Sequence, residues 1–113
     1  LTYVSDTVEG FIKTAESEKG VGEAINIGSG NDISIGELTK KIMMIIGKDV
    51  KIQIDKKRIR PINSEVKRLC ADNSRAAKIL GWKAKVPLDD GLRRTVNYIK
   101  SHLDYYKPDE YIV

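Results

Sequence analysis

Cysteine and histidine are almost absent from this chain, because Cys70 and His102 are the only residues of their kinds among 113. A single cysteine cannot form an intrachain disulfide, and such usage is typical of a cytoplasmic protein. One cysteine and one histidine also cannot supply the four ligands of a structural zinc site. The apolar-polar alternation around Cys70 favours a small buried thiol over a nucleophile paired with His102.

Long apolar runs are also absent. No stretch approaches the roughly 20 apolar residues of a membrane-spanning helix. The opening "LTYVSDTVEG" has no cationic segment followed by an apolar one, so it does not resemble a signal peptide. It does not begin with methionine either, so we expect a piece of a longer protein. With 41% hydrophobic and 32% charged residues, residues 1–113 are expected to form a single globular domain.

Helix start and stop signals mark four helices. The first two carry capping boxes, in which an N-cap side chain and an acidic residue three positions later exchange hydrogen bonds with the backbone. The fourth is expected from about Leu88, with Asp89 and Asp90 at its positive end. The predicted N-terminal caps are Asp6 with Glu9 in the first helix, Ser34 with Glu37 in the second, and Asp72 or Asn73 in the third. The predicted stops are Gly20 and Gly22 for the first helix, Gly47 for the second and Gly81 for the third.

Apolar residues three or four apart predict the buried helix faces. Trp82 is expected to pack as a core plug. The predicted faces are Val8, Phe11, Ile12 and Ala15 in the first helix; Ile35, Leu38, Ile42 and Ile45 in the second; and Leu92, Val96, Ile99 and Leu103 in the fourth.

Short apolar segments at residues 1–4, 23–28 and 50–54 predict three strands. The resulting order is strand, helix, strand, helix, strand, loop, helix, helix. This alternation predicts an α/β fold, a three-strand, four-helix unit with parallel pairing where helices cross over.

No self-contained active site is recognisable. "GSG" at 28–30 lacks the third glycine of a dinucleotide-binding turn, since Ile33 occupies that position, and no G-K-[ST] follows. A catalytic tyrosine with a lysine four residues later is also missing. The residues four after Tyr3, Tyr98, Tyr105 and Tyr106 are Thr7, His102, Asp109 and Glu110, and Tyr111 lies too near the end.

Positive charge gathers in and just before "RIRPINSEVKRL", residues 58–69. Six cations lie between Lys56 and Arg68, with Glu65 as the one acid. If the backbone is extended, Arg58 and Arg60 project to one side, and their planar guanidinium groups can grip phosphate oxygens. Pro61 favours that extended geometry at Arg60. From the pattern alone, a solvated basic loop, a nucleic-acid patch and a phosphate clamp all stay open.

The chain as a whole resembles a known family. "TYVSDTVEGFI", "AINIGSGNDISIGEL", "RIRPINSEVKRLCADNSRAAKILGW" and "PLDDGLRRTVNYI", in this order, look like the C-terminal lobe of extended Rossmann-type short-chain dehydrogenases/reductases. These are the NAD-dependent nucleotide-sugar epimerases and dehydratases. The R-x-R-P-x-x-S-E-V-x-R-L run and the closing "YKPDEYIV" are most similar to N-acetyl-hexosamine nucleotide 4,6-dehydratases of nonulosonic, legionaminic-type sugar synthesis.

The resemblance implies a division of labour. The N-terminal Rossmann half would bind NAD, hold the catalytic residues and pair the parent enzyme as a homodimer. This chain would bind the nucleotide-diphosphate sugar, with UDP or GDP left open, and would hold no catalytic residue. Arg60 matches the family's diphosphate-binding arginine, Glu65 or Asn63 could hold the ribose, and Arg58 and Arg68 are lesser candidates.

The parent reaction implied is oxidation at sugar C4, loss of water across C5–C6 and hydride return to C6; an epimerase would return the hydride to C4. A small basic nucleic-acid-binding domain is the rival from another class. Aromatic residues make up only 6% of the chain, and Trp82 and Phe11 lie in apolar patterns, which disfavours base stacking.

Overall fold

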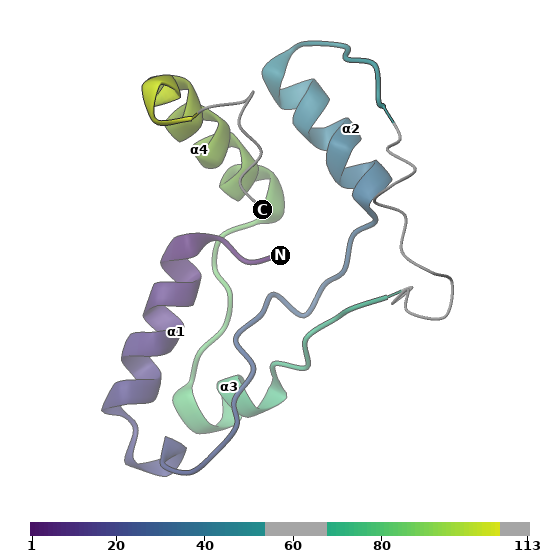
Figure 1. The fold of residues 1–113 in the computed structure, drawn as a ribbon. Helices are drawn as coiled ribbons and strands as arrows, with labels where there is room; N and C mark the ends of the chain where they lie inside the picture. Colours follow the sequence, from purple (N-terminus) through teal and green to yellow (C-terminus); the bar gives the residue numbers. More distant parts are fainter. Residues whose placement is uncertain (54–67, 107–113) are drawn as a thin grey trace.

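The computed structural model describes residues 1–53 and 68–106. Its helices are α1 (Val4–Glu16), α2 (Ile35–Ile46), α3 (Ser74–Leu80) and α4 (Leu88–Ser101), with short 3₁₀ turns η1 (Glu18–Gly20) and η4 (Leu103–Tyr105). Figure 1 shows α2 beside α4 at one end of the molecule, and α1 beside α3 at the other. The connections between the two helix pairs carry the residues of greatest functional interest.

The core of the described residues lies in the α1–α3 half. Ala76 and Leu80 of α3 are buried with Trp82, and Ile25, Ile27, Ile79 and Ala84 pack against them. Trp82 is only 1% exposed, and its indole Nε1 donates a hydrogen bond to the backbone carbonyl of Asp6 at 3.0 Å. The prediction that Trp82 is a core plug is confirmed.

Asp6 does not cap the first helix. The helix begins at Val4, and Asp6 is buried in its first turn. Its Oδ2 accepts hydrogen bonds from the backbone N–H groups of Lys85 at 3.0 Å and Val86 at 2.9 Å. Glu9 binds the Lys85 ammonium at 2.7 Å instead of completing a capping box. The predicted box was wrong because both acids bind a segment almost 80 residues away.

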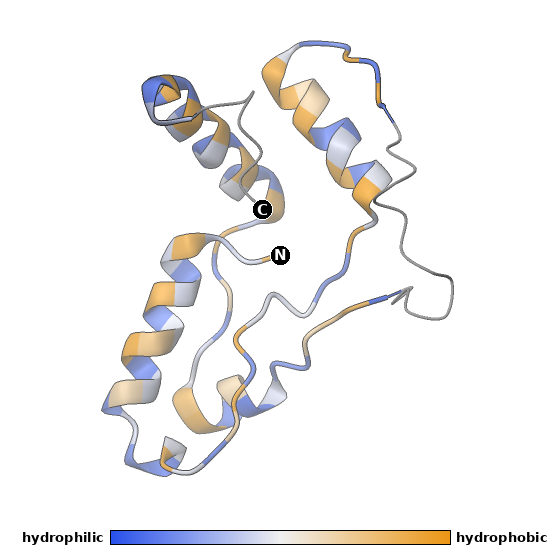
Figure 2. Ribbon diagram, viewed as in Figure 1, coloured by the Kyte–Doolittle hydropathy of each residue, from blue (hydrophilic) through white to orange (hydrophobic). Residues whose placement is uncertain are grey.

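The predicted buried face of α1 was also wrong. Val8, Phe11 and Ile12 are 49%, 69% and 52% exposed. The helix buries its opposite side through Asp6 and Gly10. A Cβ at Gly10 would lie 2.8 Å from Ile27 Cγ2, so glycine at this position lets the extended segment of residues 24–27 approach α1 closely. Figure 2 shows the remaining apolar residues of α1 as orange bands along the ribbon.

The sequence signals for the ends of α2 and α3 were more reliable than the signals for the buried face of α1. In α2 the full capping box of Ser34 and Glu37 forms, and Gly47 ends the helix with a φ of +67°, both as predicted. Gly81 ends α3 in the same left-handed conformation. Asn73 is the N-cap residue of α3, but the Asp72 carboxylate accepts the Ser74 N–H at 2.9 Å.

The fourth helix begins at Leu88 as predicted, with Asp89 and Asp90 in its first turn. Asp89 also binds Lys41 of α2 at 2.7 Å, so it joins two helices in addition to its favourable place at a helix start. No α2 residue is fully buried, and Ile35 of its predicted buried face is 77% exposed.

The three predicted strands are not supported. No strand occurs among residues 1–53 and 68–106, and Ile54 of the third one lies outside them. Residues 24–27 do show the side-chain alternation of a strand, with Ile25 and Ile27 partly buried and Ala24 and Asn26 exposed. A strand needs the hydrogen bonds of a neighbour. Residues 1–53 and 68–106 offer none, so within these ranges the strand pattern occurs without a sheet.

Candidate functional site

Four of the five predicted substrate-binding residues lie outside the described part of the chain. These are Arg58, Arg60, Asn63 and Glu65. Arg68, at the end of the basic segment, is described, and its side chain is 75% exposed. Arg68 and the groups around it are therefore the described part of the predicted site.

Arg68 forms a two-pronged ion pair with Asp32. Its Nε and Nη2 donate to the two carboxylate oxygens, the second at 3.0 Å. These hydrogen bonds lower the pKa of Asp32 and raise that of Arg68. Sequence reasoning missed Asp32, because 36 residues separate it from its partner. The one available signal was a carboxylate directly after the glycine-rich turn.

Residues 28–32 form a compact turn between the extended segment and α2. Gly30 has a φ of +74°, which glycine adopts without strain. The Ser29 hydroxyl accepts the Asn31 N–H and donates to the Asn31 carbonyl, both at 3.3 Å. Asn73 donates to the Gly28 carbonyl at 2.9 Å, which fixes the turn to the start of α3.

This turn does not fit a dinucleotide. Dinucleotide turns use glycines to bring the backbone close to a pyrophosphate. Here a Cβ at Gly28 would lie 2.6 Å from the Ala71 Cβ, and one at Gly30 would lie 3.1 Å from Asn73 Nδ2. The two glycines therefore admit the chain's own side chains, which makes this turn unlike a dinucleotide-binding one.

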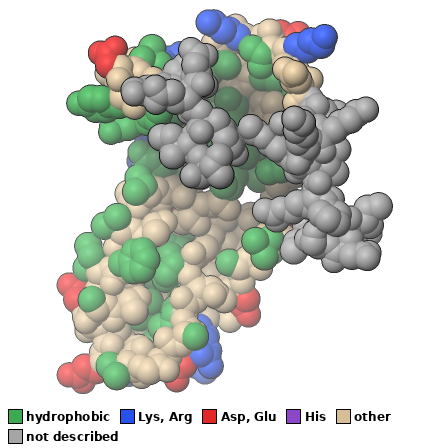
Figure 3. Space-filling view, in the orientation of Figure 1, with side chains coloured by type: hydrophobic (Ala, Val, Ile, Leu, Met, Phe, Trp, Pro, Cys, Tyr) green, Lys and Arg blue, Asp and Glu red, His purple; other side chains and the backbone are tan. Residues whose placement is uncertain are grey.

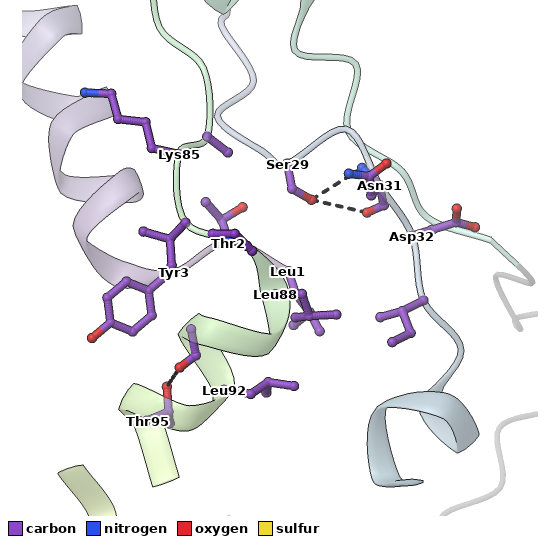
Figure 4. Close-up of a pocket in the computed structure, with 15 residues that line it drawn as sticks. Leu1, Thr2, Tyr3, Ser29, Asn31, Asp32, Lys85, Leu88, Leu92 and Thr95 are labelled. Carbon is purple, nitrogen blue, oxygen red and sulfur yellow. Dashed lines mark hydrogen bonds between the residues drawn. The ribbon is translucent and has the colours of Figure 1, made fainter. Parts of the chain in front are cut away.

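A cavity of about 470 Å³ opens beside the turn, a size within the range of ligand pockets. Its walls come from the first three residues, the turn, residues 84–88 and the start of α4. Figure 4 shows Leu1, Leu88 and Leu92 together, with the Asp32 carboxylate directed away from Leu88 and Leu92. The cavity is therefore mainly apolar with a charged rim.

Asp6 holds the part of the cavity wall that residues 84–88 form. The two backbone N–H groups that its carboxylate accepts belong to Lys85 and Val86, both of which line the cavity. A second cavity of about 180 Å³ also borders the turn, and Gly28, Leu69 and Ala71 are among the residues that line it. The end of the basic segment thus reaches the turn next to both cavities.

Several polar side chains of the described residues are hydrogen-bonded to the chain's own backbone. Among residues 1–53 and 68–106, no cluster of three or more histidines, cysteines and carboxylates could hold a metal ion. The Thr95 hydroxyl donates to the Gly91 carbonyl at 2.8 Å. His102 Nδ1 lies 2.8 Å from the Tyr98 carbonyl and 3.0 Å from the Ser101 hydroxyl. Cys70 is exposed, contrary to the buried thiol predicted.

Within the described ranges, no helix combines the length and the apolar character required to cross a bilayer. In the described part of the chain, the features best suited to hold a ligand are the Arg68–Asp32 ion pair, the turn that carries Asp32 and the two cavities beside that turn.

Comparison with known proteins gives a consistent result. A family model described as GDP-mannose 4,6 dehydratase matches residues 1–95. The chain is 35% identical over 108 residues to the UDP-glucuronate 4-epimerase of Thermodesulfobacterium geofontis, covering 94% of this chain and 31% of that protein. It is 28% identical over 110 residues to UDP-glucuronic acid decarboxylase 1 of Xenopus tropicalis, covering 97% and 25%.

The structure is also similar to that of the Bordetella bronchiseptica enzyme WbmF. The complex with NADH superposes with a TM-score of 0.74 at 30% identity, covering 93% of this chain and 30% of that one. The complex with NAD⁺ and UDP gives a TM-score of 0.68 at 34% identity, covering 88% and 29%. The chain therefore spans less than a third of the length of these relatives.

Proposed function

Because the chain belongs to the family described as GDP-mannose 4,6 dehydratase, we propose that it is the nucleotide-sugar-binding lobe of an NAD-dependent epimerase or dehydratase. The proposed reaction of the whole enzyme is 4,6-dehydration of a nucleotide-linked N-acetylhexosamine. The resemblance to extended short-chain dehydrogenases/reductases supports the assignment of NAD binding and homodimer formation to the remainder of that enzyme.

The ion pair between Arg68 and Asp32 is the observation that carries this proposal. It fixes the end of the basic segment to the turn at residues 28–32, beside two cavities. Arg60 precedes this fixed point by eight residues (68 − 60). Arginine is suited to phosphate because its planar group donates two parallel hydrogen bonds. Arg60 is therefore proposed as the main diphosphate ligand, supported by Arg58, with Glu65 or Asn63 on the ribose.

Arg68 has a double role in this proposal. A guanidinium group has five N–H donors, and two of them are directed at Asp32. The remaining three can still donate to an anion, although the carboxylate offsets part of the positive charge. Arg68 is therefore proposed as a positioning residue for the basic segment and as a secondary phosphate contact.

A 4-epimerase is the second candidate, because the relative at 35% identity is a UDP-glucuronate 4-epimerase. The two reactions share the same nucleotide-sugar lobe in the proposal and differ in where the hydride returns. Product analysis distinguishes them, since dehydration removes one water from the sugar whereas epimerisation leaves its mass unchanged.

The test is the Arg60→Ala substitution in the whole enzyme, with Arg75→Ala as the matched control. Arg75 is exposed and binds Glu23 at 2.7 Å, away from the turn. We expect Arg60→Ala to weaken binding of UDP and UDP-N-acetylglucosamine at least about tenfold, since a charge-assisted phosphate contact is lost. Arg75→Ala should bind as the unchanged protein does, and NAD affinity should be equal in all three.

Titration with single-stranded DNA at several salt concentrations addresses the rival class. A nucleic-acid-binding domain would bind DNA with an affinity that falls steeply as salt rises. Unchanged nucleotide-sugar affinity in Arg60→Ala, or salt-sensitive DNA binding stronger than UDP binding, would contradict the proposed function.

A further inference from the structure

The turn at residues 28–32 is tied to the chain that follows Arg68 by two side-chain hydrogen bonds. They run from the Asn26 amide to the Asp72 carbonyl at 3.3 Å and from the Asn73 amide to the Gly28 carbonyl at 2.9 Å. These two bonds fix the positions of both backbones. The ion pair with Asp32 can therefore set the direction of the Arg68 side chain.

Asp32 is the better fixed member of this ion pair. Its side chain is 34% exposed, whereas the side chain of Arg68 is 75% exposed. On one side Asp32 follows the hydrogen-bonded turn of Ser29 and Asn31, and two residues further on the capping box of Ser34 begins α2. The carboxylate thus projects from backbone that is held on both sides, and the long arginine side chain adapts to it.

The carboxylate also selects one edge of the guanidinium group. Arginine presents its N–H groups in two forks, a side fork of Nε with Nη2 and an end fork of Nη1 with Nη2. Asp32 occupies the side fork. Among residues 1–53 and 68–106, Nη1 of Arg68 donates to no partner. The end fork can therefore donate to an anion, and its two parallel N–H groups match two oxygens of a phosphate group.

Other described cations are placed elsewhere. Figure 3 shows the clearest Lys and Arg side chains of the face in view at its upper and lower ends. Lys85 lines the larger cavity, but its ammonium group binds Glu9 at 2.7 Å. The guanidinium group that Asp32 holds at the turn is therefore the described cation best placed to meet an anion there.

We propose that Asp32 is a positioning residue, which holds the Arg68 guanidinium by its side fork and so presents the end fork to a phosphate group of the nucleotide sugar. Asp32 acts only through Arg68. A guanidinium group that is already fixed loses less rotamer freedom when it binds, and salt and water screen the repulsion between the exposed carboxylate and the phosphate. The choice of a nucleotide sugar as the anion rests on the proposed function, whereas the positioning of the fork does not.

A double-mutant cycle in the whole enzyme tests whether Asp32 acts through Arg68. We expect Asp32→Ala to weaken UDP binding about three- to tenfold, because Arg68 must then be ordered on binding. Asp32→Glu keeps both acceptor oxygens and should restore most of the affinity. In the Arg68→Gln background, Asp32→Ala should have no further effect. Unchanged or tighter UDP binding by Asp32→Ala, or an equal loss in both backgrounds, would overturn the proposal.

Glu23→Ala is the matched control, because it removes the carboxylate of another exposed arginine pair, the one with Arg75. Its UDP affinity should equal that of the unchanged enzyme. Asp32→Ala should change the melting temperature no more than Glu23→Ala does, since exposed ion pairs add little to stability. A weaker-binding Asp32→Ala enzyme that also melts several degrees lower than Glu23→Ala would assign the loss to folding and overturn the positioning role.

Pyrophosphate separates this inference from the proposed function. In enzyme with isotope-labelled arginine, the Nε–H signal of Arg68 is the one that Arg68→Gln removes. Slow exchange of this proton that depends on Asp32, with pyrophosphate binding that Asp32→Ala weakens, would support the positioning role. The same result in an enzyme that binds neither UDP nor UDP-N-acetylglucosamine would contradict the function alone. UDP binding that Asp32→Ala leaves unchanged would contradict the positioning role alone.

Discussion

The Arg68 guanidinium grips both carboxylate oxygens of Asp32, and it thereby joins the end of the basic segment to the turn before α2. Both side chains remain accessible to solvent. Exposed ion pairs add little to stability, so the value of this pair lies in where it holds the chain.

The pH dependence of this pair follows from the lowered pKa of Asp32. An aspartate carboxyl ordinarily has a pKa of 3.8, and the Arg68 hydrogen bonds hold the pKa of Asp32 below that value. A carboxyl group with a depressed folded-state pKa contributes stability that is present above its unfolded pKa and lost as pH falls through the folded one. We expect NMR titration of the Asp32 carboxyl carbon to give a midpoint below 3.8. In Arg68→Gln the midpoint should return toward 3.8; an unchanged midpoint would contradict the pairing.

Replacement of Asp6 by alanine should be strongly destabilising. The carboxylate is 2% exposed and accepts two backbone N–H groups, which the variant leaves without partners. Each buried unpaired group costs roughly 1–3 kcal/mol, so for two groups we expect a loss of about 2–6 kcal/mol in the free energy of unfolding. Urea denaturation followed by Trp82 fluorescence measures it. Asp90→Ala is the control, since Asp90 is exposed and pairs with Arg93 of the same helix; equal losses in both variants would refute the role of Asp6.

Ser34→Ala should remove the capping box of α2. The Ser34 hydroxyl accepts the Glu37 N–H at 3.1 Å and donates to the Glu37 carboxylate at 2.8 Å. Loss of an N-cap side chain costs about 1 kcal/mol, and the lowered pKa of Glu37 should rise toward 4.5. Denaturation and a carboxyl titration check both effects. Thr39→Ala is the control, because its hydroxyl bonds only to Ile35 within the helix.

Two glycine substitutions should have opposite effects. A Cβ at Gly28 would overlap the Ala71 Cβ at 2.6 Å, whereas a Cβ at Gly36 would meet nothing within 4 Å. Gly28→Ala should therefore cost about 1–3 kcal/mol through overpacking. Gly36→Ala, in α2, should be stabilising by up to about 1 kcal/mol through helix propensity. Thermal melts of both variants check the prediction, and a Gly28→Ala protein as stable as the parent would contradict the close approach.

Sequence reasoning succeeded where the signal is local. The capping box at Ser34 depends on residues three apart, and the stops at Gly47 and Gly81 depend on the backbone freedom of a single residue. It failed where the partner is distant. Asp6 looked like a cap because its partners, Lys85 and Val86, are 79 and 80 residues away.

The exposed apolar residues of α1 and the segment 24–27 show a second limit of prediction from sequence. Apolar periodicity says which side chains should be covered, but it does not say which element covers them. The pattern at Val8, Phe11 and Ile12 predicted burial, yet the described residues leave all three exposed. For the same reason, the short apolar run at 23–28 predicted a strand, although no described neighbour pairs with it. The ligand residues at 58–65 lie outside the described ranges, so their assignment stays a prediction.

The bonds between Asp6 and residues 82–86 also constrain the order of events during synthesis. They join positions 76 to 80 residues apart, so α1 emerges from the ribosome long before its partners exist. At about 5–20 residues per second, the delay is of the order of 4–16 s. Until residues 82–86 have been made, Asp6 cannot form these hydrogen bonds, so this part of the core is completed only late in synthesis.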